Sequence, residues 1–266
     1  MTPHIHPSMA AIGTPLEHLV IRHAGDTFRR IMGGPAVKHD RRFIRLATGE
    51  AHPFGNFACM ADHPDPEGVR AAIGPFMQSG APSAMIFNAS VAGDAITELA
   101  TNGFVAHGGL TAMAVDIESL RSTTLPAGYA FARANNPQQR DAWAAAFAHG
   151  YGLPPQTGSA FAGGLGAETA DDASIQYFWI LKDGQPVCNS VCVLGDGVAG
   201  IYAVATLPQE RGKGLGAFAT AEPLRIAHRL GYRVGVLQAS DEGHPVYRRI
   251  GFVDVGAVPL YLRMLA

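Results

Sequence analysis

The sequence predicts a mixed α/β protein in which a mostly antiparallel sheet is flanked by helices. Short apolar runs, most of them rich in Val, Ile and aromatic residues, alternate with Ala-rich segments of helical pattern. Turn signals such as Asp183-Gly184 separate successive strand-like runs, which is typical of antiparallel hairpins. Hydrophobic residues make up 47% and charged residues 16% of the 266 residues, so the chain has enough apolar material for a core.

The elements of the C-terminal half can be assigned in chain order. We expect a strand at Tyr129–Arg133 and then a helix at Pro137–His149, with Asn136 as its N-cap. Residues 150–174 are rich in Gly, Pro, Ala and Thr, which predicts a long loop or a broken helix. Three antiparallel strands are expected next, at Ile175–Leu181, Pro186–Leu194 and Val198–Thr206.

The end of the chain predicts two further helices with a strand between them. Leu215–Leu230 has a helical pattern, but Pro223 within it removes a backbone donor, so we expect this helix to be kinked or split. Val234–Ser240 predicts a strand. In the following segment Pro245 suits the first turn of a short helix, and Gly251 suits its left-handed stop.

The most informative segment is a glycine-rich loop at residues 208–217, between a predicted strand and a predicted helix. Three alternate glycines allow the backbone to adopt positive φ and to approach a ligand closely: Gly212, Gly214 and Gly216. The start of a helix also has unpaired N–H groups, and the cations of Arg211 and Lys213 lie in the same loop. This combination predicts a binding site for a diphosphate.

Three known phosphate-binding motifs can be compared with this loop. A Walker A motif needs Gly-Lys followed by Ser or Thr, which the chain lacks. The dinucleotide pattern G-x-G-x-x-G/A is met by Gly212, Gly214 and Ala217, but the chain ends about fifty residues later, too soon for a doubly wound sheet. The acidic ribose ligand of that motif is also absent. The third pattern, R-x-x-G-x-G/A, is met by Arg211, Gly214 and Gly216.

A second motif follows in the expected order, Tyr247-Arg248-Arg249-Ile250-Gly251-Phe252. Together the two motifs resemble the signatures of the GNAT superfamily of N-acetyltransferases, and the resemblance covers about residues 126–266. It implies a GNAT fold, acetyl-CoA as cosubstrate, and direct transfer of an acetyl group to a primary amine of a small molecule or peptide. A non-catalytic acyl-CoA-binding or regulatory module is the alternative.

The resemblance also assigns roles to residues. It implies that the strands at Val198–Thr206 and Val234–Ser240 splay apart at their C-terminal ends. The pantetheine arm would then bind to backbone groups of Val204, Ala205 and Thr206. It places the diphosphate on the loop residues Arg211, Gly212, Lys213, Gly214, Leu215, Gly216 and Ala217. Tyr247 matches the general acid that protonates the departing thiolate. Ser240 stands where many members have Asn, and it still offers one hydrogen bond to the cofactor.

The general base and the acceptor are left open by the sequence. Several residues are candidates for accepting the proton of the amine, directly or through a water: Asp241, Glu242, His244 and Tyr202. For His244 the alternative is a role as N-cap of the short helix. Carboxylates in the region that covers the acceptor in this family favour a cationic amine, with solvated surface charges as the equal alternative: Glu168, Asp171 and Asp172.

The N-terminal half shows signs of an internal repeat. Gly103-Phe104 and Gly108 recur as Gly251-Phe252 and Gly256, in each case 148 residues later. We expect residues 1–125 to form a degenerate GNAT-like domain, without a cofactor loop, packed on the catalytic domain of residues 126–266. Its expected elements are a strand at Ser83–Phe87, a helix ending near Asn102 and a strand at Leu110–Val115. The alternative is a chance match of two helix-stop Gly-Phe pairs.

Composition narrows the remaining possibilities. A net charge of −2 provides no basic surface for nucleic acid, and no apolar run is long enough for a membrane span. Neither a signal peptide nor a metal-ligand motif is evident, and three cysteines fit no disulfide framework: Cys59, Cys188 and Cys192. We therefore expect a cytoplasmic protein with no metal, nucleic acid or membrane partner. The oligomeric state and the acceptor remain open.

Overall fold

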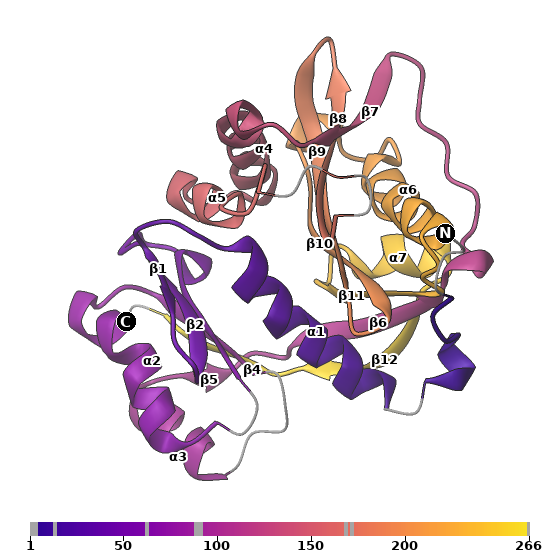
Figure 1. The fold of residues 1–266 in the computed structure, drawn as a ribbon. Coiled ribbons are helices and arrows are strands. Elements are labelled where there is room, and N and C mark those ends of the chain that lie inside the picture. Colours follow the sequence, from indigo (N-terminus) through magenta and orange to yellow (C-terminus); the bar gives the residue numbers. More distant parts are fainter. Residues whose placement is uncertain are drawn as a thin grey trace.

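The computed structural model describes residues 5–12, 15–61, 64–87, 93–167, 170 and 173–264. Two mixed sheets, each flanked by helices, form two lobes (Figure 1). The long helix α1 (Leu16–Ile31) lies between them and contributes to one core that contains side chains from both sheets. The fold class expected from the sequence is confirmed.

The larger sheet has seven strands, and only its β10–β11 pair is parallel. In spatial order the strands are β12 (Val253–Val258), β6 (Leu110–Asp116), β11 (Val234–Ala239), β10 (Val198–Thr206), β9 (Gln185–Gly195), β8 (Ile175–Lys182) and β7 (Tyr129–Ala134). One face packs on α6 (Leu215–Arg229) and α7 (His244–Ile250). The other packs on α1, α4 (Arg140–Tyr151) and α5 (Pro155–Phe161).

The smaller sheet has six strands, with β3–β4 as its parallel pair. Its order is β1 (Val37–His39), β2 (Phe43–Ala47), β3 (Asn56–Met60), β4 (Ser83–Phe87), β13 (Leu260–Arg263) and β5 (Val105–Ala106). Helices α2 (Pro66–Ser79) and α3 (Gly93–Thr101) pack on one face through a separate apolar cluster, and α1 covers the other face.

Each sheet contains one strand from the other half of the chain. β6 lies between β11 and β12, and β13 lies between β4 and β5. The two crossing segments meet where Leu110 pairs with Val258. A side chain on the neighbouring Gly109 would lie 2.7 Å from the carbonyl oxygen of Val258, so only glycine fits this crossing. The sequence did not predict this exchange, because equivalent strands of a repeat have the same apolar pattern and fit either sheet.

The two Gly-Phe pairs on which the expected internal repeat is based both lie at the ends of helices. After α3, Gly103 has a φ of 79° and the N–H of Phe104 bonds to the carbonyl of Leu99 at 3.0 Å. After α7, Gly251 has a φ of 113° and the N–H of Phe252 bonds to the carbonyl of Tyr247 at 3.1 Å. Both helices therefore end in the same left-handed glycine stop, followed by a buried Phe. The strands expected at 83–87 and 110–115 are confirmed.

Most elements of the C-terminal half also lie where the sequence predicts them. The strand at 198–206 and the short helix ending before Gly251 are confirmed. Asn136 forms a capping box as expected, but on a separate short turn at Pro137–Gln139, and α4 begins only at Arg140. Residues 150–174 contain a short helix, α5. The prediction that Pro223 splits its helix is wrong, because α6 is continuous from Leu215 to Arg229. Burial of its apolar face against the sheet outweighs one missing hydrogen bond.

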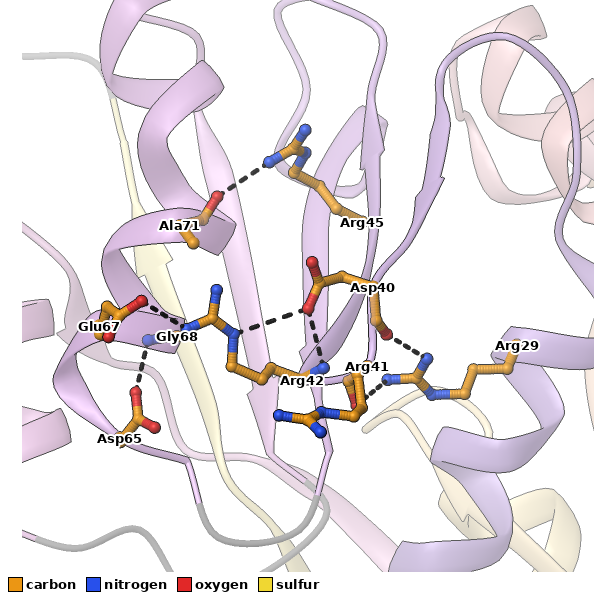
Figure 2. A network of polar contacts seen from close by, with 9 residues as sticks. All are labelled: Arg29, Asp40, Arg41, Arg42, Arg45, Asp65, Glu67, Gly68 and Ala71. Carbon is orange, nitrogen blue, oxygen red and sulfur yellow. Dashed lines mark hydrogen bonds and ion pairs between the residues drawn. The ribbon is translucent and has the colours of Figure 1, made fainter.

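A second helix, α2, also contains a proline, and here the missing hydrogen bond is replaced. Pro75 has no N–H to bond to the carbonyl of Ala71, four residues earlier. Arg45 of β2 donates from Nη1 to that carbonyl oxygen at 3.0 Å (Figure 2). Arg42 donates to the carboxylate of Glu67 at 3.0 Å, so two arginines connect α2 to the smaller sheet (Figure 2).

Candidate functional site

The two parallel strands of the larger sheet diverge, as the resemblance to GNAT proteins implies. β10 and β11 pair only at Ala199 with Gly235 and at Gly200 with Val236, although β10 continues to Thr206. Ala203 has a φ of 50° within a bulge that shifts the register against β9. Among the described strands none pairs with the β11-facing edge of β10 beyond Gly200, so backbone groups there are open to a ligand.

A cleft of about 480 Å³ opens at this divergence. Its size is within the range of ligand sites. With the exception of Lys213, it is lined by all the residues predicted to bind the cofactor or to act as general acid: Val204, Ala205, Thr206, Arg211, Gly212, Gly214, Leu215, Gly216, Ala217, Ser240 and Tyr247. The sequence therefore identified one continuous surface. It did not identify the other lining residues: Gly150, Tyr151, Glu210, Gly243, Val246 and Arg249.

The glycine-rich loop has the conformation that the sequence predicts. Gly212 has a φ of 77° and Gly214 a φ of 79°, which L side chains rarely adopt. Gly214 is the N-cap of α6, and no side chain caps the helix. The first N–H groups of α6 therefore remain available to an anion, and the helix dipole adds to the attraction.

Arg211 connects the loop to the far wall of the cleft. Its Nη2 donates to the carbonyl oxygen of Gly150 at 2.8 Å, and its Nη1 lies 3.9 Å from the Glu242 carboxylate. Gly150 has no space for a side chain, because a Cβ there would lie 2.9 Å from that of Ala205. The last turn of α4 thus packs directly on the splayed strand, which explains why Gly150 lines the cleft.

Lys213 was expected to bind the diphosphate, but it does not line the cleft. Its Nζ lies 2.6 Å from the carboxylate of Glu210 and 3.3 Å from the hydroxyl of Tyr129. Lys182 contacts the other Glu210 oxygen at 3.0 Å. Hydrogen bonds from Lys213, then Tyr129 and Lys182, lower the pKa of Glu210 to about 2, so this carboxylate is ionised at neutral pH.

Tyr247 has the burial expected of a proton donor. It is 8% exposed, lies on α7 and packs against Phe252. Burial raises the pKa of its phenol above the ordinary value of 10, so the hydroxyl stays protonated at neutral pH. Ser240, at the end of β11, accepts a hydrogen bond from the N–H of Gly243 at 3.3 Å and lines the same cleft.

Of the four candidate bases, only Glu242 lines the cleft, and its side chain is 86% exposed. His244 is the first residue of α7, whose N-cap is Gly243, and its Nε2 lies 2.9 Å from Asp254. Tyr202 is buried, and its hydroxyl lies 2.6 Å from Nδ1 of His23 on α1. The acidic residues expected near the acceptor lie outside the described residues: Glu168, Asp171 and Asp172.

The described part of the chain contains neither a metal-binding cluster nor a membrane-spanning helix. No group of three or more His, Cys, Asp or Glu side chains there is arranged to hold a metal ion. No helix among the same residues combines the length and the apolar character needed to cross a membrane.

No protein-family model matches the sequence, and no curated protein matches it, but solved structures do. A GCN5-related N-acetyltransferase from Kribbella flavida aligns over 95% of this chain and 96% of its own, with a TM-score of 0.57 and 20% identity. One from Sphaerobacter thermophilus covers 84% and 77%, with a TM-score of 0.56 and 14% identity. A tandem GNAT protein from the clavulanic acid biosynthesis pathway covers 98% of both chains, with a TM-score of 0.52 and 11% identity. The chain therefore has the GNAT fold in its tandem form.

Proposed function

We propose that this protein is an N-acetyltransferase that uses acetyl-CoA and transfers the acetyl group directly to a primary amine. The observation that carries the proposal is the meeting of three features in one cleft. These are the open edge of β10, the positive-φ loop at the start of α6, and the buried phenol of Tyr247.

The cleft fits acetyl-CoA in both of its halves. The unpaired N–H groups at the start of α6, with Arg211 beside them, suit the diphosphate. The backbone of Val204–Thr206 suits the amide-bearing pantetheine arm, which would pair with the strand edge as a peptide does. Bound acetyl-CoA would supply the thioester to the place where β10 and β11 part.

Two groups of this chain support the transfer of the acetyl group. A backbone N–H near the bulge at Ala203 would stabilise negative charge on the thioester oxygen. Tyr247 would donate its hydroxyl proton to the departing thiolate, since its raised pKa keeps that proton in place. Glu242 is the candidate base that lines the cleft, where it would accept a proton from the amine through a water.

The N-terminal half is proposed to bind no cofactor. By the repeat, its parallel strands β3 and β4 correspond to β10 and β11. They stay paired to their last residues, Met60 with Phe87, and so leave no open strand edge between them. Its proposed roles are to stabilise the second half and to cover the acceptor side.

Calorimetry with acetyl-CoA and with NADH tests the cofactor, and thiol release in the presence of amines tests the reaction. We expect acetyl-CoA to bind and NADH not to bind. We also expect thiol release with a member of a panel of polyamines, amino acids, aminoglycosides and peptide N-termini. NADH binding without a CoA response would overturn the proposal. CoA binding without turnover on any amine would favour a non-catalytic acyl-CoA-binding module.

A further inference from the structure

The carboxylate of Glu210 lies in an unusual place for a site that binds an anion. It immediately precedes Arg211, lines the cleft, and is only 6% exposed. An acidic group beside a diphosphate site repels the ligand, so its presence there needs a separate reason. Its partners provide that reason, because they connect the loop to two strands of the sheet.

Three side chains converge on Glu210. Tyr129 from the start of β7 donates its hydroxyl to Oε2, and Lys182 from the end of β8 lies 3.0 Å from Oε1. Lys213 from within the loop lies 2.6 Å from Oε2. Two ammonium groups more than neutralise the single carboxylate, so the cluster as a whole does not repel an anion.

Lys213 stands between the two glycines that have positive φ, Gly212 and Gly214. At both glycines a Cβ would have no heavy atom within 4 Å, so side-chain packing at these positions does not restrain the loop. Glycine also loses more conformational freedom on ordering than any other residue. The ion pair from Lys213 to Glu210 is therefore a restraint on the backbone of Gly212–Gly214, whose two glycines line the cleft.

We propose that Glu210 is a positioning residue of the phosphate-binding loop. Through Lys213 it holds the Gly212–Gly214 backbone in its anion-binding conformation, and through Tyr129 and Lys182 it fixes that backbone to the sheet. The identity of the anion as the diphosphate of CoA rests on the proposed function, whereas the role of Glu210 in holding the loop does not.

The affinity of the Glu210→Gln variant for CoA separates this role from simple electrostatics, because the two explanations predict opposite changes in that affinity. If charge alone mattered, losing a carboxylate would tighten the binding of an anion. If Glu210 positions the loop, binding weakens, and we expect at least a tenfold increase in Kd by calorimetry. KM for acetyl-CoA rises in parallel, while kcat at saturation stays within about twofold. Unchanged or tighter binding by Glu210→Gln overturns the proposal.

A matched control for binding is a glutamate that does not line the cleft. Glu222→Gln makes the same change in net charge on α6, where Glu222 pairs with Arg225, and it leaves Kd unchanged. A tenfold loss of affinity in this control would show that the loss is not specific to Glu210, and it would overturn the proposal.

A second variant and a second ligand allow the proposal to be tested if the first experiment fails. If Glu210→Gln does not fold, Tyr129→Phe removes one hydrogen bond without changing charge. A Kd at least threefold higher supports the positioning role, and an unchanged Kd overturns it. If the unmodified protein does not bind CoA, the proposed function fails. The same variants are then titrated with inorganic pyrophosphate, and the order of affinities tests Glu210 on its own.

Discussion

Met113 of the N-terminal half pairs with Leu237 of the C-terminal half in antiparallel register, within the sheet that holds the cleft. The strand that contains Met113, β6, is the shared partner of β11 and β12. β11 ends at the cleft, next to Ser240. One wall of the candidate site thus rests on a strand that the N-terminal half supplies.

Residues 126–266 expressed alone are expected not to fold cooperatively. Without β6, the strands β11 and β12 lose their common partner, and the buried Met113 and Val115 leave the core beneath α6. Co-expression with residues 1–125 as a separate chain should restore a folded complex. Thermal unfolding followed by circular dichroism measures both. A cooperative transition in the isolated fragment would show that β6 is dispensable.

Short sequence motifs predicted the residues of the candidate site better than they predicted the order of strands in the sheets. The glycines and the charged residues of the loop are contiguous in the chain, and the residues from Arg211 to Ala217 line the cleft as predicted, with the exception of Lys213. The Lys213 side chain contacts Glu210 in the same loop and Tyr129, which is distant in sequence, and motif reasoning did not find these contacts. The strand exchange depends on contacts between halves and left no local signal.

The buried imidazole of His23 predicts a loss of stability in acid. Burial, reinforced by Arg30 and Arg22 and opposed by Asp196, lowers its pKa from 6.5 to about 4, so the folded protein holds it neutral. Between these values the unfolded chain binds more protons, so stability falls as pH decreases from 6.5 towards 4, by up to about 3 kcal/mol. The contribution of the neutral His23 to the free energy of unfolding is present in full above pH 6.5.

Denaturant unfolding of the unmodified protein and of His23→Gln between pH 4 and 7 measures this effect. The variant should be less stable at pH 7, because it loses the hydrogen bond with Tyr202, but its stability should fall less on acidification. Gly200→Ala is a structural companion, since a Cβ there would lie 2.4 Å from the imidazole ring and should destabilise the protein at every pH. Parallel pH profiles for the unmodified protein and His23→Gln would contradict the assignment.

Two alanine substitutions in the loop should separate the effect of backbone conformation on CoA binding from the effect of added side-chain volume. Gly214→Ala forces an L side chain into a φ of 79°, which costs about 1–2 kcal/mol, so CoA binding should weaken roughly tenfold or more. Gly216→Ala is the control, because its Cβ would make only ordinary contacts, 3.7 Å from the Thr206 hydroxyl. Calorimetry should therefore give near-normal affinity for Gly216→Ala. Equal affinities for the two variants would mean that the φ of Gly214 does not shape the site.

Tyr247→Phe tests the chemical step that the cleft is proposed to support. Removing the hydroxyl while keeping the ring should lower kcat by roughly ten- to a thousand-fold, because a thiolate of pKa about 8.5 leaves with only moderate help from an acid. The ring keeps its packing against Phe252, so Kd for CoA should stay nearly unchanged. The phenol pKa is raised by burial, so in the unmodified protein ionisation of Tyr247 should not reduce kcat between pH 7 and about 10. If CoA binding and turnover fell by the same factor in the variant, the hydroxyl would be part of the binding surface rather than the proton donor.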